Sequence, residues 1–179
     1  MAALATACGS TPGTSAAPVA SLTPATPAAS PAHAGPPPCP TRSLRAKIGV
    51  SQGAAGSTYV AIVFTNISNV TCTLYGYPGI SFAGGTPVSQ IGIAATESNV
   101  TPRKLVTLAP NAAGNALLRI VHAENFPAAK CHRVTAKYLQ IYPPNQTTPI
   151  YLSFSSTTCS KPVQILTVGV VQPGAGSAS

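Results

Sequence analysis

Carboxylate side chains are almost absent from this sequence. Its 179 residues include no Asp and only two Glu, Glu97 and Glu124, against 10 Lys plus Arg, which gives a net charge of +8. Charged residues make up 7% of the chain, whereas soluble domains usually have about 25%. Glycoside hydrolysis would depend on that single Glu pair. Calcium cages and two-metal phosphoryl sites are excluded because they need more carboxylate oxygens.

Long apolar runs, tryptophan and clustered positive charge are also missing. No stretch reaches the roughly 18 consecutive apolar residues that a membrane-spanning helix needs. The absence of Trp excludes the antibody-type core in which a Trp packs on a disulfide. Basic residues form one local cluster, Arg42, Arg45 and Lys47, and a smaller one, Arg103 and Lys104, and the rest are scattered. Because a nucleic-acid module usually presents a basic face with interleaved aromatics, we expect no nucleic-acid partner.

The first eight residues resemble the end of a bacterial lipoprotein signal. Small residues precede Cys8, with Leu4 ahead of them, one position further from the Cys than is usual in a lipobox. A secretory signal also has a basic start and an apolar stretch of roughly 7–15 residues. Residues 1–8 therefore predict the residual end of a longer signal. We expect lipidation at Cys8, export, and anchoring at the outer face of the cytoplasmic membrane or in the cell wall.

Residues 9–38 have the composition of a linker. They contain 8 Pro, 8 Ala, 4 Ser, 4 Thr and 3 Gly, and no charge. Such a segment cannot bury enough apolar surface to offset its ordering entropy, so it predicts a disordered tether. Extended polyproline geometry would give it a reach of roughly 90 Å. We expect it to separate a folded domain from its anchor, and its Ser and Thr residues are candidate sites for O-linked sugar.

From Cys39 onward, short β-rich segments alternate with turn signals. This spacing predicts an all-β fold, an immunoglobulin-like antiparallel sandwich over residues 39–171, followed by a disordered tail at 172–179. The run 58–64 is apolar on both faces, as a central strand should be. The predicted strands are 43–50, 58–66, 71–75, 79–83, 87–95, 104–108, 115–123, 134–142, 149–154 and 163–171.

Four cysteines remain once Cys8 is assigned to lipid. An even number in an exported domain indicates two disulfides, for which three connectivities are possible. No Cys-x-x-Cys occurs, so the spacing does not indicate zinc. We favour Cys39–Cys72 and Cys131–Cys159, because each closes a loop of about 30 residues, worth about 3 kcal/mol in the chain-entropy model.

A motif around Cys72 resembles a known family. The motif residues are Phe64-Thr-Asn66 and Thr71-Cys-Thr-Leu-Tyr-Gly-Tyr-Pro-Gly79, with Gly53 to Gly56 upstream and Val106-Thr-Leu108, Pro110, Gly114, Ala116, Cys131 and Cys159 downstream. This pattern is similar to domain of unknown function 4232, a family common in exported actinobacterial lipoproteins. The resemblance implies a β-sandwich on an exported, often lipid-anchored chain. It transfers no catalytic residue, because the family has no established activity.

The centre of this motif, Tyr75-Gly76-Tyr77-Pro78-Gly79, predicts a tight turn after a disulfide-anchored strand. A tyrosine ring with a polar tip would pack against that turn. The alternative is that these tyrosines form an exposed platform for a ligand.

The acid–base residues closest in sequence are His122, Glu124 and His132. As an alternative function, they could hold a metal, or a His–Glu pair could activate a serine for hydrolysis. No G-x-S-x-G elbow or H-E-x-x-H helix accompanies them. A strand end that enters a polar loop explains the same residues without any chemistry.

Together these features favour a non-enzymatic, envelope-anchored binding module with no cofactor. Its expected partners are the membrane, through the lipid on Cys8, and a cell-wall glycan or an envelope protein. The loops near 76–79, 96–103 and 143–148 are the predicted binding surfaces. A wall protein held only by its positive charge is a further alternative, whose binding should vanish with salt.

Overall fold

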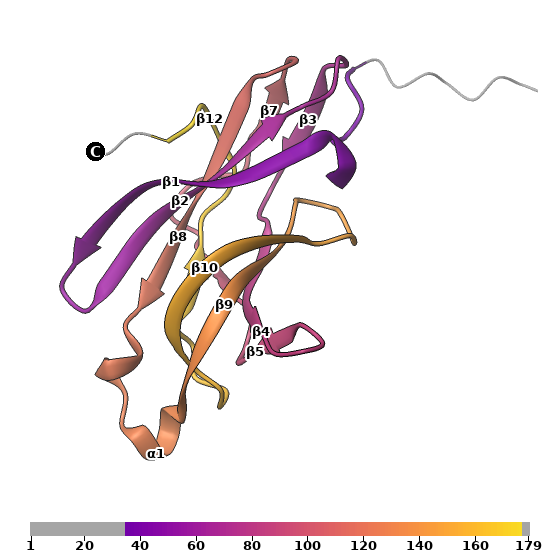
Figure 1. Ribbon diagram of the computed structural model, residues 1–179. Coiled ribbons are helices and arrows are strands. Elements are labelled where there is room, and N and C mark those ends of the chain that lie inside the picture. The colour runs from indigo at the N-terminus through magenta and orange to yellow at the C-terminus, as the bar shows by residue number, and fades with distance from the viewer. Residues whose placement is uncertain (1–34, 177–179) are drawn as a thin grey trace, which may run out of the picture. The chain divides into compact units, whose positions relative to one another are not determined.

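The structure is a computed structural model that describes residues 35–176 (Figure 1). Residues 1–34 and 177–179 lie outside the described part, and so do the predicted lipidation site Cys8 and most of the predicted tether. The strands are β1 (Leu44–Ala54), β2 (Ser57–Asn66), β3 (Cys72–Tyr75), β4 (Gly79–Gly84), β5 (Ser89–Ile91), β6 (Thr96–Glu97), β7 (Leu105–Leu108), β8 (Ala113–Val121), β9 (Arg133–Tyr142), β10 (Ile150–Cys159), β11 (Leu166–Val168) and β12 (Gln172–Pro173).

The strands form two main sheets that pack on one core. The first has the order β1-β2-β8-β11-β6, with β12 also paired to β8, and the second has the order β10-β9-β4-β5. All pairs are antiparallel except β11 with β6. The buried core draws Val60, Ile62 and Leu118 from the first sheet and Phe82 and Leu139 from the second. The predicted all-β antiparallel sandwich is therefore confirmed.

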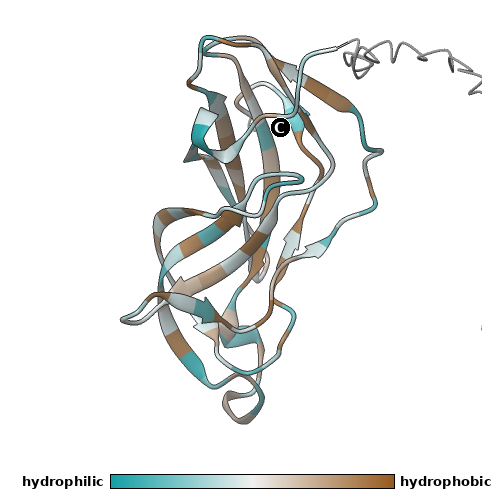
Figure 2. Cartoon of the chain, turned by 90° about the vertical axis from the view of Figure 1, so that its right-hand side faces the viewer, coloured by the Kyte–Doolittle hydropathy of each residue, from teal (hydrophilic) through white to brown (hydrophobic). Residues whose placement is uncertain are grey.

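Alternation along the strands explains why these sheets pack face to face. In β8 the burial alternates strictly from Gly114 to Ile120, and hydrophilic and hydrophobic residues alternate visibly along the strands in Figure 2. Strand β2 is buried on both faces from Val60 to Phe64, as its apolar run predicts. A third pair, β3 with β7, adds Leu74, Val106 and Leu108 to the same core.

Both predicted disulfides are present. Cys39–Cys72 ties the start of the domain to β3, and Cys131–Cys159 ties a short helix to the end of β10. That helix, α1 (Ala128–Cys131), was not expected from the sequence, and two 3-10 turns, Thr41–Ser43 and Ala123–Asn125, flank β1 and β8. Between residues 35 and 176, no helix is long and apolar enough to cross a membrane.

Both domain boundaries differ from the sequence-based expectation. The backbone of Pro37 accepts a hydrogen bond from the amide of Thr73, and Pro38 forms a bridge with Thr73, so the last linker residues lie along β3. The tail expected at 172–179 instead begins with β12, whose Gln172 and Pro173 pair with Asn115 and Gly114 of β8. Backbone pairing beyond both ends of the β-rich segment explains the difference.

Several predicted strands also change their extent, and the first, expected at 43–50, runs on to Ala54 in β1. The 87–95 segment keeps only β5, because Gly92 has a φ of +67° that turns the chain away. The 163–171 segment breaks after Val168, and its chain continues along β8 to β12. Strand β10 runs on to Cys159 through a Ser/Thr-rich stretch, because β9 supplies partners for it after a bulge.

Candidate functional site

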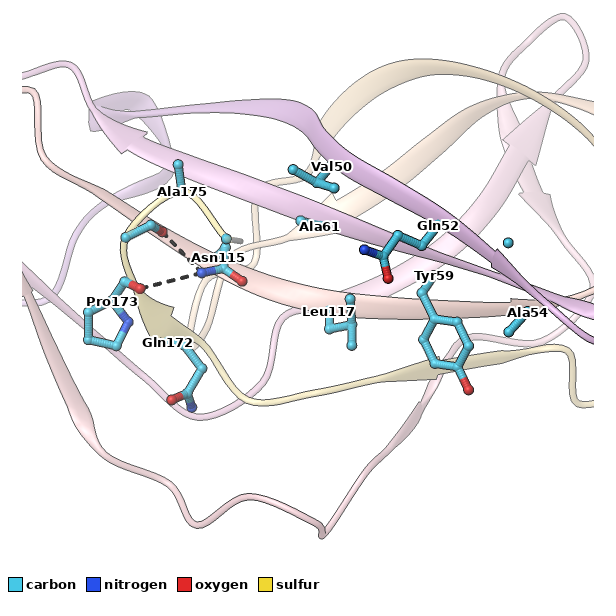
Figure 3. Close-up of a pocket in the computed structure, with 13 residues that line it drawn as sticks. Val50, Gln52, Ala54, Tyr59, Ala61, Asn115, Leu117, Gln172, Pro173 and Ala175 are labelled. Carbon is cyan, nitrogen blue, oxygen red and sulfur yellow. Dashed lines mark hydrogen bonds between the residues drawn. The ribbon is translucent and has the colours of Figure 1, made fainter. Parts of the chain in front are cut away.

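An open groove lies on the outer face of the first sheet (Figure 3). It measures about 820 Å³, a size typical of ligand pockets. Tyr59 and Ala61 of β2 and Leu117 of β8 form its floor, because alternation turns these side chains away from the core. Leu117 is 49% exposed although it is a large apolar residue.

Two segments that are distant in sequence form the walls of the groove. One is the far half of β1, with Val50 and Gln52, and the other is the C-terminal segment 172–176. Asn115 Nδ2 holds the second wall by donating to the carbonyl oxygens of Gly174 at 3.1 Å and Pro173 at 3.5 Å. The lining contains no charged side chain. Its polar groups are Tyr59 and the amides of Gln52, Asn115 and Gln172.

The predicted turn at Tyr75–Gly79 is a structural junction. Tyr77 is half-buried, and its hydroxyl donates to the carbonyl oxygen of Ser98 at 2.8 Å. The Arg103 guanidinium lies 4.9 Å from the centre of the Tyr77 ring and pairs with Glu97 at 2.9 Å. The turn therefore fixes the 96–103 loop. Gly76 is required in it because its φ is +94°, a conformation that other residues rarely adopt.

The second tyrosine of the motif faces solvent. Tyr75 is 48% exposed and lies opposite Leu105, itself 63% exposed, across the β3–β7 pair. Asn145 Nδ2 donates to the Tyr75 carbonyl oxygen at 3.4 Å. The structure thus brings the three predicted binding loops to one place, with Tyr77 holding one of them and Tyr75 free at the surface.

The structure does not unite His122, Glu124 and His132. His122 and Glu124 border one depression of about 360 Å³, and His122 Nε2 lies 3.0 Å from Thr58 Oγ1. His132 sits instead at the end of α1, where its Nδ1 lies 2.9 Å from Ser160 Oγ. Within the range 35–176, no group of three His, Cys, Asp or Glu side chains could hold a metal. The alternative three-ligand site is therefore not formed.

The contacts of His132 explain its position structurally. Ser160 Oγ donates its single hydrogen to the His132 carbonyl oxygen at 2.9 Å, so His132 Nδ1 acts as the donor in the second bond. His132 also has a left-handed φ of 49°, which ends the helix. His132 and Ser160 directly follow Cys131 and Cys159, so these hydrogen bonds join the same two segments as the disulfide.

Sequence reasoning missed the structural importance of Asn66 and the groove. Asn66 is fully buried; its Nδ2 donates to the carbonyl oxygens of Val70 and Leu108, and its Oδ1 accepts from the backbone and hydroxyl of Ser68. The position of Asn66 in the family motif is the sequence feature that could have indicated its importance. No sequence feature indicates the groove, because the segments that form its walls are far apart in the sequence and meet only in the folded structure.

Comparison with known proteins places this architecture in a family. Neither the curated proteins nor the solved structures gave a significant match. One family does match, and its span begins at the first disulfide cysteine and ends inside β12. The chain belongs to the family described as a domain of unknown function (DUF4232), which matches residues 39–172.

Proposed function

We propose that this protein is an exported, lipid-anchored binding module of the cell envelope that acts without catalysis. The observation that carries the proposal is the uncharged groove of about 820 Å³ on the outer face of the first sheet. Two disulfides support the exported location, because such bonds persist in oxidising compartments. Lipid on Cys8 would hold the domain at the membrane, with residues 9–34 as the tether.

The groove suits a polypeptide segment of an envelope protein. Its floor and rim offer apolar side chains, of which Val50 and Leu117 are 40% and 49% exposed. The amides of Gln52 and Gln172 can donate and accept, and Asn115 Oδ1 can accept, which complements the peptide groups of an extended segment. Because the lining carries no charge, such binding should resist salt.

Affinity capture from envelope extracts tests this function. The full chain is immobilised and exposed to extract at low and high salt, together with two matched variants, Leu117→Gln in the groove and Leu105→Gln beside Tyr75. We expect a protein ligand that is retained at both salt concentrations, lost with Leu117→Gln and kept with Leu105→Gln.

The other outcomes discriminate among the alternatives. Loss with Leu105→Gln alone would move the site to the loops near Tyr75. Capture that disappears at high salt for every variant would support the charge-held wall protein. If both variants captured the protein as well as the natural chain did, at low and at high salt, the result would contradict a role for the groove.

Anchoring is tested separately at the N-terminus. Mass spectrometry of the native N-terminal peptide should find Cys8 carrying lipid. An unmodified Cys8 thiol would contradict the anchor and would leave the groove's binding function standing.

A further inference from the structure

The outer face of the second sheet carries half of the chain's tyrosines. Tyr138 and Tyr142 lie on β9 at alternate positions with Gln140 between them, while Leu139 and Ile141 point into the core. In the register of the sheet, Tyr151 of β10 lies opposite Gln140. We call Tyr138, Gln140, Tyr142 and Tyr151 the tyrosine face.

Hydrogen bonds hold three members of the tyrosine face, Gln140, Tyr142 and Tyr151, in one arrangement. Gln140 Nε2 donates to the hydroxyl oxygens of Tyr142 at 2.9 Å and Tyr151 at 3.1 Å. Gln140 Oε1 accepts from Ser81 Oγ at 3.3 Å, and Ser81 is buried at 3% exposure. The amide is therefore oriented from below by a buried hydroxyl, and it orients two tyrosine tips in turn.

This arrangement leaves unused donors at the surface. Because both tyrosine hydroxyls accept from Gln140, their own O–H groups remain available to donate. Among residues 35–176, neither hydroxyl has an acceptor within hydrogen-bonding distance. Tyr151 is 47% exposed and Tyr138 is half-buried, so both ring surface and polar tips are accessible.

The charge of the tyrosine face selects the kind of partner. Its cross-strand neighbours are all uncharged, namely Gly79, Ser81 and Ala83 on β4, Gln90 on β5 and Ser153 on β10. Although the chain has a net charge of +8, neither the tyrosine face nor these cross-strand neighbours include a Lys or an Arg. A polyanion would gain little here, whereas a ligand with hydroxyl groups and apolar C–H faces matches both the rings and the unused donors.

We propose that the tyrosine face binds a neutral glycan. Sugar rings contact the rings of Tyr138 and Tyr151, and sugar oxygens accept from the hydroxyls of Tyr142 and Tyr151. The tyrosine face lies on the second sheet, whereas the groove lies on the first. A test of glycan binding is therefore independent of a test of the protein ligand proposed for the groove.

Titration of the full chain with neutral oligosaccharides tests the proposal. The probes are the hexasaccharides of β-1,4-glucose, α-1,4-glucose and β-1,4-N-acetylglucosamine, with calorimetry as the readout. We expect at least one to bind, with affinity reduced about tenfold or more in Tyr138→Ala and in Tyr151→Ala. Tyr151→Phe keeps the ring and removes the hydroxyl donor. Its oligosaccharide affinity should therefore lie between that of the alanine variants and that of the natural chain.

Controls make each result decisive. Leu117→Gln in the groove should leave oligosaccharide binding unchanged, and each variant's thermal transition shows that it is folded. Binding of none of the three probes would overturn the proposal. It would also be overturned if Tyr138→Ala and Tyr151→Ala kept the oligosaccharide affinity of the natural chain.

Discussion

Asn66 shows how one polar side chain can organise a whole end of this domain. Its amide makes four side-chain hydrogen bonds inside the protein, two donated and two accepted, so no polar atom of a fully buried residue is left unpaired. Its backbone also bonds with Ala112 and Asn111. The 66–71 loop, β7 and the turn before β8 therefore depend on one residue.

Replacing Asn66 by Asp should be strongly destabilising. The carboxylate would face the carbonyl oxygens of Val70 and Leu108 without a hydrogen to donate, so we expect a loss of about 3 kcal/mol or more in unfolding free energy. Urea denaturation of the natural chain and the variant measures this difference in unfolding free energy. Asn69→Asp is the matched control, because Asn69 is exposed in the same loop and should change stability by less than about 0.5 kcal/mol.

Gly92 is a second position where a single residue decides the local chain path. Its φ is +67°, and a Cβ there would lie 2.5 Å from the carbonyl oxygen of Cys159, which is backbone and cannot rotate away. Gly92→Ala should cost about 2 kcal/mol or more through combined strain and overlap.

The control for Gly92 is Gly53→Ala in β1, where a Cβ meets nothing within 4 Å and φ is not positive. We expect that variant to be neutral or slightly stabilising in thermal denaturation. Equal effects at the two glycines would show that the approach to Cys159 has no energetic importance.

At the scale of elements, the two-residue strand β12 determines the path of the C-terminal segment. It pairs with Asn115 and Gly114 of β8, and the chain then turns back over the sheet until Gly176 reaches Ala61. This path buries Ala61 to 4% exposure and builds one wall of the groove. The groove therefore exists only because the last described residues pair with a strand in the middle of the sheet.

Truncation after Val171 should remove that wall and expose the outer face of β2. We expect a loss of about 1–3 kcal/mol in unfolding free energy, from the lost pairing and the exposed apolar surface, together with loss of the groove's ligand. Chemical denaturation and the capture assay measure the two effects. Truncation after Gly176 is the control and should retain both. If the shorter chain still captured the ligand, segment 172–176 would not be part of the site.

At the scale of the whole molecule, the imbalance of charge is the dominant feature. The pair Glu97–Arg103 is the one ion pair in the described residues, and both side chains are about half exposed. The remaining cations repel one another through solvent, so the disulfides and the sandwich core hold the domain against a net charge of +8.

Stability should therefore rise with salt. Raising ionic strength from about 10 mM to about 150 mM shortens the screening length from roughly 30 Å to 8 Å, which weakens repulsion among the cations. We expect the urea midpoint to increase. Lys130 lies in α1, and Lys161 Nζ donates to the carbonyl oxygen of Ala129 in the same helix, so two cations lie at one place. We therefore expect a smaller increase in the Lys130→Gln, Lys161→Gln double variant. An unchanged or falling midpoint in the natural chain would show that charge repulsion does not limit stability.

The sequence by itself determined the all-β class and the core strands, and it favoured the disulfide pairing that the structure contains. These follow from local patterns: alternation over 134–142, an apolar run at 58–64, and four cysteines whose favoured pairs are close along the chain. The motif at residues 71–79 also indicated its family, which the match over residues 39–172 confirms.

Only the tertiary structure decided which surfaces could bind. The groove needs β1, β8 and the 172–176 segment together, and the tyrosine face needs the register that places Tyr151 opposite Gln140. Likewise, His122 and His132 are near in sequence but separate in space, because the turn after β8 and helix α1 carry them to different partners. Local composition predicts strands, whereas strand pairing and chain reversal determine which side chains meet.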